Sequence, residues 1–149
     1  MPMPETWADI AGRRKGAAHV LPVRVYYEDT DAGGVVYHAN YLKYCERARS
    51  DCLRLLGIHQ QQFDGMGFVV RRMVCDFLAP ARLDDLVEVE TRFLQTAGAR
   101  LELDQQVVLG EKTLFRALVT VALIDARGRP KRLPAEIKAA LQSRYESQS

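Results

Sequence analysis

Hydrophobic and polar residues alternate along most of the chain, which predicts β-strands. In residues 20–27, Val23, Val25 and Tyr27 alternate with Arg24 and Tyr26, the pattern of a half-buried strand. Four later segments are long enough for strands, at residues 68–78, 86–95, 100–109 and 113–124. The short links at 96–98 and 110–112 contain glycine, which indicates antiparallel hairpins.

Residues 39–56 break this alternation, because their apolar positions recur every three or four residues. The apolar face comprises Tyr41, Tyr44, Cys45, Ala48, Cys52, Leu55 and Leu56, with charged residues opposite. This pattern predicts one long helix with a single apolar stripe. We expect an ion pair between Arg47 and Asp51, and Gly57 as the end of the helix.

The order of elements predicts an α+β protein. One long helix and five antiparallel strands can bury their apolar faces together if the sheet wraps around the helix. Pro134 predicts the start of a short C-terminal helix. We expect residues 20–149 to form a single domain, and residues 1–19 a flexible extension with an Arg13-Arg14-Lys15 trio. A wrapped sheet leaves an unpaired edge, so we also expect self-association.

Composition excludes several classes. The chain of 149 residues is 48% hydrophobic with a net charge of +2, and it has no basic stripe with interleaved aromatics to suggest nucleic-acid binding. No apolar run is long enough for a membrane span, and residues 1–16 lack a secretion signal, which favours the cytoplasm. The scattered cysteines and histidines argue against disulfides and against a metal site.

Candidate chemistry concentrates in residues 23–49, where a strand leads to an acidic cluster, a Gly-Gly turn and then the helix. This order places a carboxylate near the free N–H groups at the start of a helix. Gly33 and Gly34 lack a β-carbon, so the loop can turn tightly and an acyl group can approach the backbone. A carboxylate facing N–H donors is suited to attack on a carbonyl group.

These residues carry a resemblance to a known family. Residues 26–41, Tyr-Tyr-Glu-Asp-Thr-Asp-Ala-Gly-Gly-Val-Val-Tyr-His-Ala-Asn-Tyr, resemble the signature of hotdog-fold acyl-CoA thioesterases. The chain is most similar to the 4-hydroxybenzoyl-CoA thioesterase group, in the branch associated with the Tol-Pal system of Gram-negative bacteria. Residues 67–71 and 76–85 also match, so that the likeness covers about residues 20–140.

The resemblance implies roles for individual residues. Asp31 would be the nucleophile or general base, and the backbone N–H of His38 would polarise the thioester carbonyl. Tyr27 aligns with a tyrosine thought to line the same pocket. The resemblance also implies acyl-CoA as substrate, and a tetramer of hotdog dimers with active sites between subunits. We expect no metal and no cofactor.

Several alternatives stay open. The His38 side chain could position water or substrate, although an N–H at a helix start needs no particular side chain. Asp29 is a loop-bonding or solvated carboxylate in our interpretation, and Glu46 is a rival acid or a surface partner of Arg49. The acyl chain, its carrier (CoA or acyl carrier protein) and the basic residues that hold CoA phosphates are not specified by the sequence. A hotdog hydratase and a non-catalytic acyl-thioester-binding component of an envelope complex remain alternative functions.

Overall fold

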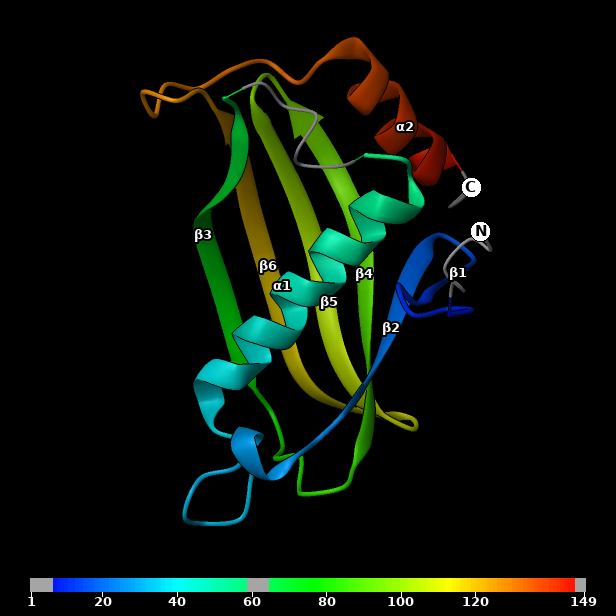
Figure 1. Cartoon of the computed structure of the whole chain (residues 1–149), viewed down its shortest axis with the longest axis vertical. Coiled ribbons are helices and arrows are strands. Elements are labelled where there is room, and N and C mark those ends of the chain that lie inside the picture. The colour runs from blue at the N-terminus through cyan, green and yellow to red at the C-terminus, as the bar shows by residue number, and fades with distance from the viewer. Residues whose placement is uncertain (1–6, 59–64, 147–149) are drawn as a thin grey trace, which may run out of the picture.

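The computed structural model describes residues 7–58 and 65–146 as a curved antiparallel sheet with one long helix across its inner face (Figure 1). The strands are β1 (Arg13–Lys15), β2 (Ala18–Arg24), β3 (Gly67–Phe77), β4 (Leu86–Ala97), β5 (Arg100–Leu109) and β6 (Lys112–Ile124). Their order in the sheet is β1-β2-β4-β5-β6-β3, and all neighbours are antiparallel. The expected α+β hotdog architecture is confirmed, but the sheet has six strands instead of five.

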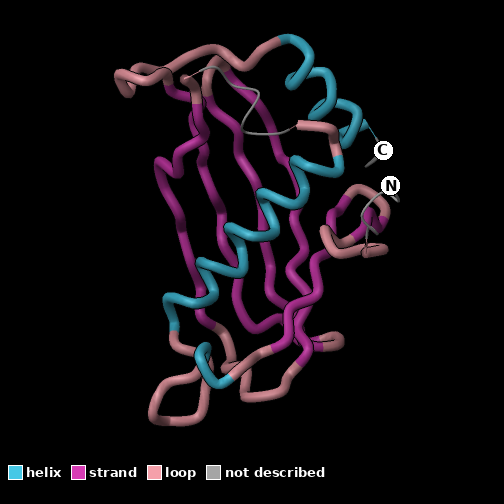
Figure 2. Tube along the Cα trace, in the orientation of Figure 1, coloured by secondary structure: helices cyan, strands magenta, loops and turns pink. Residues whose placement is uncertain are grey.

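Helix α1 (His38–Leu55) provides one side of the core, as its apolar stripe predicts. Its side chains Tyr41, Tyr44, Cys45, Ala48 and Cys52 are buried against the inward residues of β4, β5 and β6. Figure 2 shows the helix running obliquely over these strands. Because the sheet curves around the helix, a single apolar stripe is enough to bury both elements.

The end of α1 confirms the expected stop at Gly57. Gly57 adopts a φ of 78°, its N–H donates to the Arg54 carbonyl oxygen, and the Ile58 N–H donates to that of Leu53. This pair of hydrogen bonds is a Schellman motif, which satisfies the last helical carbonyl groups. The expected pairing of Asp51 is wrong, because Asp51 pairs with Arg54 at 2.7 Å and not with Arg47.

The strand expected at residues 20–27 has different bounds at both ends in the structure. Strand β2 ends at Arg24, and Tyr27–Asp29 form a short 3-10 helix, η1, in which Glu28 is exposed and Asp29 buried. At the other end the sheet begins before residue 20, because β1 and β2 form a hairpin between Arg13 and Arg24. Strand β1 is three exposed polar residues, which give no periodic signal.

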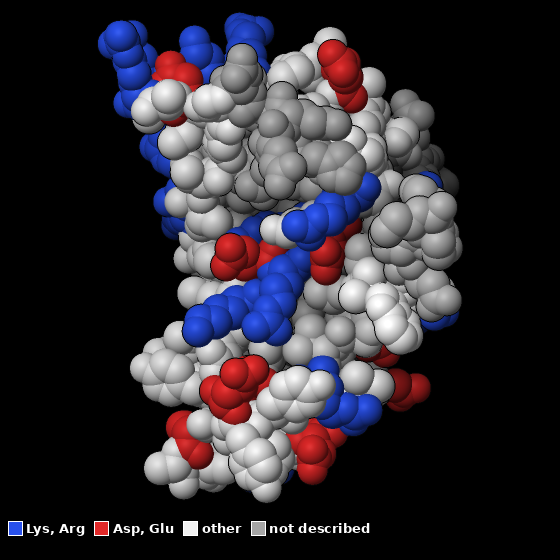
Figure 3. Space-filling view, viewed as in Figure 1, with Lys and Arg blue, Asp and Glu red and all other residues white. Residues whose placement is uncertain are grey.

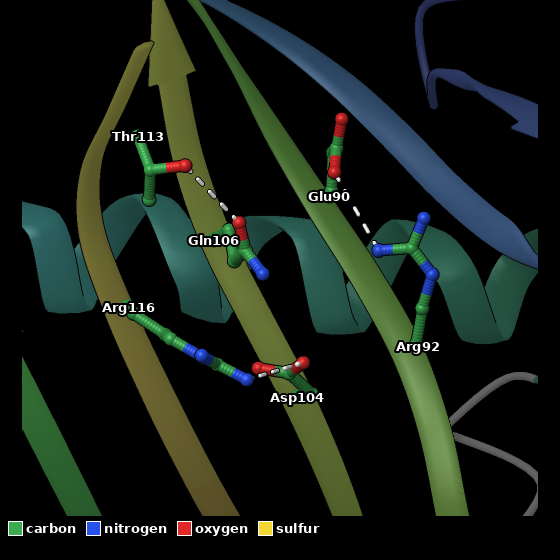
Figure 4. A network of polar contacts seen from close by, with 6 residues as sticks. All are labelled: Glu90, Arg92, Asp104, Gln106, Thr113 and Arg116. Atoms are coloured by element: carbon green, nitrogen blue, oxygen red, sulfur yellow. Dashed lines mark hydrogen bonds and ion pairs between the residues drawn. The ribbon is translucent and has the colours of Figure 1, made fainter. Parts of the chain in front are cut away.

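The face of the sheet away from α1 is polar over β4, β5 and β6. Glu90 and Arg92 form an ion pair at 3.6 Å, Asp104 and Arg116 form another at 3.5 Å, and Thr113 donates to Gln106. Figure 4 shows these six side chains on the near side of the strands, with the helix behind. The main core lies on the inner face, against α1.

The remaining elements lie at the margins of the sheet. Strand β3 is an edge strand, and among the strands within residues 7–58 and 65–146 it pairs with β6 alone. Helix α2 (Ala135–Glu146) follows Pro134 as expected and buries Ile137 and Leu141 against the core. No helix within residues 7–58 and 65–146 combines the length and hydropathy needed to cross a membrane.

Candidate active site

The loop between η1 and α1 is a tight hairpin that presents Asp31 near the start of the helix. Thr30 and Val36 form an antiparallel bridge, and the Asp31 N–H donates to the Val35 carbonyl oxygen at 2.9 Å. The Val36 N–H donates to the carbonyl oxygen of Ala81, in the β3–β4 connection, at 2.9 Å. The loop is therefore fixed both to itself and to the end of the sheet.

Both glycines suit this geometry. The Asp31 Oδ1 atom accepts the Gly33 N–H at 2.8 Å, and a β-carbon at Gly33 would lie 3.2 Å from the same oxygen. Gly34 has a φ of 78°, a conformation that other residues adopt only with strain. Neither glycine lines the cavity described below, so within this chain they shape the loop that carries Asp31.

The start of α1 supplies N–H donors. Tyr37 precedes the helix without a side-chain cap, and its own N–H donates to the Asp29 carbonyl oxygen at 2.9 Å. The N–H groups of His38 and Ala39 have no hydrogen-bond partner among the described residues. No acidic residue lies in the first turn, so the positive end of the helix dipole is not neutralised there.

Asp31 and His38 line the same cavity, which has a volume of about 360 Å³. Its other walls come from α1, from the end of β3 and from the segment after it. The lining residues are Asp31, Val35, Val36, His38, Tyr41, Phe77, Leu78, Ala79 and Pro80. A carboxylate and a helix start therefore border one space with apolar walls, which is an arrangement suited to polarising and attacking a carbonyl group.

Aromatic rings hold one side of this cavity in place. Phe77 lies edge-on to both His38 and Tyr41, with ring centroids 6.0 Å apart in each case. Tyr41 stacks on Phe115 at 5.2 Å, and its hydroxyl oxygen accepts the Ala81 N–H at 2.9 Å. Burial raises the pKa of Tyr41, which keeps the hydroxyl neutral. Sequence reasoning did not assign Phe77 or Tyr41 to the site, although both lie in or beside matched motifs.

Tyr27 is placed differently from Asp31 and His38. It lies in η1 with 82% of its surface exposed, and it does not line the cavity. Its carbonyl oxygen accepts the N–H and the hydroxyl of Thr30, at 3.2 and 3.0 Å. In this chain Tyr27 therefore contributes backbone contacts to the loop.

The carboxylates of Asp29 and Glu46 lie outside the cavity and have other surroundings. Asp29 is buried, and its Oδ2 atom accepts the Tyr26 N–H at 2.8 Å, which agrees with a loop-bonding role. Glu46 is exposed on α1 and does not line the cavity. Its expected partner Arg49 donates to the buried Gln105 Oε1 at 2.9 Å, and burial lowers the pKa of Arg49.

Basic side chains are candidates for binding CoA phosphates, and one of them, Arg82, lies beside the loop, since it forms a bridge with Val35. Residues 127–132 lie between β6 and α2, at the opposite end of the sheet (Figure 1). On the face in Figure 3, charged groups of both signs mingle over α1. Among the described residues, no cluster of three or more His, Cys, Asp or Glu side chains could hold a metal.

Comparison with known proteins identifies the family of this chain. Residues 33–115 match the family model described as "Thioesterase superfamily". The chain is 46% identical to "Acyl-CoA thioesterase YbgC" of Haemophilus influenzae, over 80% of this chain and 91% of the relative. It is 26% identical to "Acyl-acyl carrier protein thioesterase ATL3, chloroplastic" of Arabidopsis thaliana, over 86% of this chain and 70% of that protein.

A solved structure shares the fold. The crystal structure of a probable thioesterase from Bartonella henselae superposes with a TM-score of 0.76 at 42% sequence identity, covering 78% of this chain and 99% of that one. The family match extends over more than half of the chain and includes the Gly-Gly turn, the start of α1 and most of the sheet. The chain therefore belongs to the hotdog-fold thioesterase superfamily.

Proposed function

We propose that this protein hydrolyses acyl-CoA thioesters to the free acid and CoA. The observation that carries this function is the cavity that Asp31 shares with the start of α1, in a chain that belongs to the thioesterase superfamily. The name of the Haemophilus relative gives the same activity for a protein that this chain covers almost completely. Thioester cleavage needs an attacking oxygen and a donor for the developing oxyanion, and Asp31 and His38, to which we assign these roles, both line the cavity.

Asp31 takes the attacking role by one of two routes. As a nucleophile, its carboxylate adds to the thioester carbon and expels the CoA thiolate, leaving a mixed anhydride that water then hydrolyses. As a general base, it removes a proton from the water that attacks the same carbon. The Gly33 N–H that binds Oδ1 orients the carboxylate for either route.

The donor role falls to the main chain of α1. The His38 N–H can donate to the thioester carbonyl oxygen. The His38 ring packs against Tyr37 and Phe77, with ring centroids 4.5 and 6.0 Å away. A ring held between two aromatic neighbours supports a structural role for the side chain. We therefore place the catalytic contribution of His38 in its backbone.

The test is a panel of acyl-CoA and acyl-carrier-protein thioesters of different chain lengths, assayed with a thiol reagent. Release of free thiol by the wild type is the expected result, and the relative rates identify the acyl group and the carrier. The ATL3 relative, whose printed name includes acyl carrier protein, is the reason to include that carrier. Tight binding without turnover would replace hydrolysis with a binding function, and loss of enoyl absorbance without thiol release would indicate a hydratase.

We also propose that the protein works as a dimer or tetramer in the cytoplasm, in the Tol-Pal branch that the motif resembles. Strand β3 supports self-association, because it is an edge strand on which Val69, Val70, Val74 and Phe77 are exposed. A second cavity of about 300 Å³ opens beside its other end, lined by Phe68, Val69 and Val70 together with Arg49 and Glu46 of α1. Antiparallel pairing of two β3 strands would bring this cavity of one subunit towards the Asp31 cavity of the other, so active sites would lie between subunits.

A further inference from the structure

The proposed chemistry depends on the distance between two groups at opposite ends of one loop. The Asp31 carboxylate follows η1, and the His38 N–H opens α1. The bonds within the loop tip hold Asp31 to Gly33 and Val35, but they do not connect it to the helix. Contacts between the residue before the loop and the first turn of the helix fix the helix start relative to the carboxylate.

The carbonyl oxygen of Asp29 provides these contacts. It accepts the Tyr37 N–H at 2.9 Å and the side-chain Nδ2 of Asn40 at 2.8 Å. Asp29 stands just before the loop, and Tyr37 and Asn40 stand on either side of the His38 N–H. We call these two hydrogen bonds the Asp29 clamp. They join the ends of the loop at a single atom.

Asn40 is positioned to hold the helix start to Asp29, and it lies away from the cavity where substrate would bind. It is 8% exposed, lies in the first turn of α1 and does not line the Asp31 cavity. Its own N–H donates to the Tyr37 carbonyl oxygen at 2.8 Å. Asn40 therefore bonds to Tyr37 through its backbone and to Asp29 through its side chain. Asparagine is a poor residue inside helices because its amide competes for backbone partners, and here that amide is used outside the helix.

The other end of the clamp is also held. Asp29 is buried, and its carboxylate Oδ2 accepts the Tyr26 N–H at 2.8 Å. The hydroxyl of Tyr44, one turn beyond Asn40 on α1, is buried close to this carboxylate. Burial and the Asp29 charge raise the pKa of Tyr44, so that a neutral phenol faces Asp29. On the helix side, Asp29 therefore has a buried neutral hydroxyl near it, and the Arg47 guanidinium lies 6.0 Å from the centre of the Tyr44 ring.

We propose that Asn40 is a positioning residue, which acts through Asp29 to set the distance between the Asp31 carboxylate and the His38 N–H. This role rests on the proposed thioesterase function, since it concerns the groups assigned to that reaction. Misplacing reacting groups by about 1 Å can cost around 100-fold in rate. Because Asn40 does not touch the cavity, its loss should lower kcat and leave KM nearly unchanged.

The test compares Asn40→Ala with Gln105→Ala, a matched control. Gln105 is also a buried amide that donates to a backbone carbonyl of α1, that of Cys45 at 3.0 Å, but this carbonyl lies more than one helical turn beyond Asn40. We expect Asn40→Ala to lower kcat roughly 10- to 100-fold at a temperature where it is fully folded, with KM changed less than about threefold. We expect Gln105→Ala to lose thermal stability and keep its kcat.

Hydrogen–deuterium exchange supplies a readout that needs no turnover. In Asn40→Ala, peptides covering residues 29–41 should exchange faster than in the wild type, whereas Gln105→Ala should speed exchange in β5 and the middle of α1. If Asn40→Ala does not fold, Asn40→Ser provides the same comparison, because its shorter side chain does not reach the Asp29 oxygen.

The possible results separate the two levels of inference. Wild-type kcat in a folded Asn40 variant, or unchanged exchange of the loop, would overturn the positioning role while hydrolysis by the wild type stands. An equal fall of kcat in Gln105→Ala would reduce Asn40 to a purely structural residue. A wild type that cleaves no thioester would refute the proposed function, and the exchange comparison would then still decide whether the clamp orders the loop.

Discussion

At the scale of single residues, Asp31 is defined by its backbone surroundings more than by other charges. Its Oδ1 is held by the Gly33 N–H, and its loop is pinned to Ala81 and to the helix start. The order of residues predicted a carboxylate near a helix start, and the family resemblance pointed to Asp31 and His38, which line one cavity in the structure. Tyr27 could not be placed in this way, since η1 turns it outwards where an alternating strand was expected.

Asp31→Asn tests the central residue directly. The amide keeps the size and the Gly33 contact but neither attacks the thioester nor accepts a proton, so we expect thiol release to fall at least about 100-fold. The measurement is kcat/KM with the best substrate of the panel, together with the melting temperature. Asp51→Asn on the surface of α1 is the control and should keep full activity. Full activity of a folded Asp31→Asn protein would refute the assigned mechanism.

Cys45 predicts how stability depends on pH in the alkaline range. Burial raises the pKa of this thiol to about 12, whereas the pKa of an unfolded thiol is about 8.5. Between these values the unfolded chain releases a proton that the folded protein keeps, so the free energy of unfolding should fall as pH rises. Urea titrations from pH 8 to 10 measure this slope, which should be shallower in Cys45→Ala. Equal slopes in both proteins would contradict the assignment.

At the scale of elements, strong periodic patterns predicted the structure and weak ones did not. The helix and the four C-terminal strands were predicted because long apolar patterns determine what they bury. Strand β1 and helix η1 were not predicted, since each has three residues and is held by neighbours instead of its own pattern. The Asn40 contact with Asp29 was missed for a similar reason, because a backbone acceptor leaves no sign in the sequence.

The end of α1 offers a test at this scale. Gly57 has a φ of 78°, and a β-carbon at this residue would meet no heavy atom within 4 Å, so Gly57→Ala introduces backbone strain without a clash. We expect it to lower the free energy of unfolding by roughly 1 kcal/mol and to leave activity unchanged. Gly67→Ala is the control, because that site is equally open and lacks a positive φ. Chemical denaturation of both variants measures the difference, and an equal effect would argue against strain at Gly57.

At the scale of the whole molecule, the sheet is asymmetric. Its β1 edge is short and polar, whereas its β3 edge is eleven residues long and carries exposed apolar side chains. An edge of this kind is unusual unless another strand or another copy covers it. We therefore expect copies of the chain to associate through the β3 edge and not through the β1 edge.

Light scattering coupled to size exclusion tests this assembly. We expect the wild type to elute with the mass of a dimer or tetramer, and Val70→Lys on the β3 edge to shift it towards the monomer, because a charged edge strand resists pairing. Leu86→Lys introduces the same charge at a similarly exposed residue of the interior strand β4, and it should not change the mass. A fully active monomeric wild type would contradict assembly through β3.

The β3 edge is also irregular, since its register with β6 shifts between Val70 and Arg72. A bulge at this point bends and twists the strand, so a neighbouring chain can align with it over only part of its length. A bulged edge strand of this kind favours closed dimers over the continuous addition of further chains to the sheet. The exposed valines can thus serve a specific contact without turning the protein into a template for fibrils.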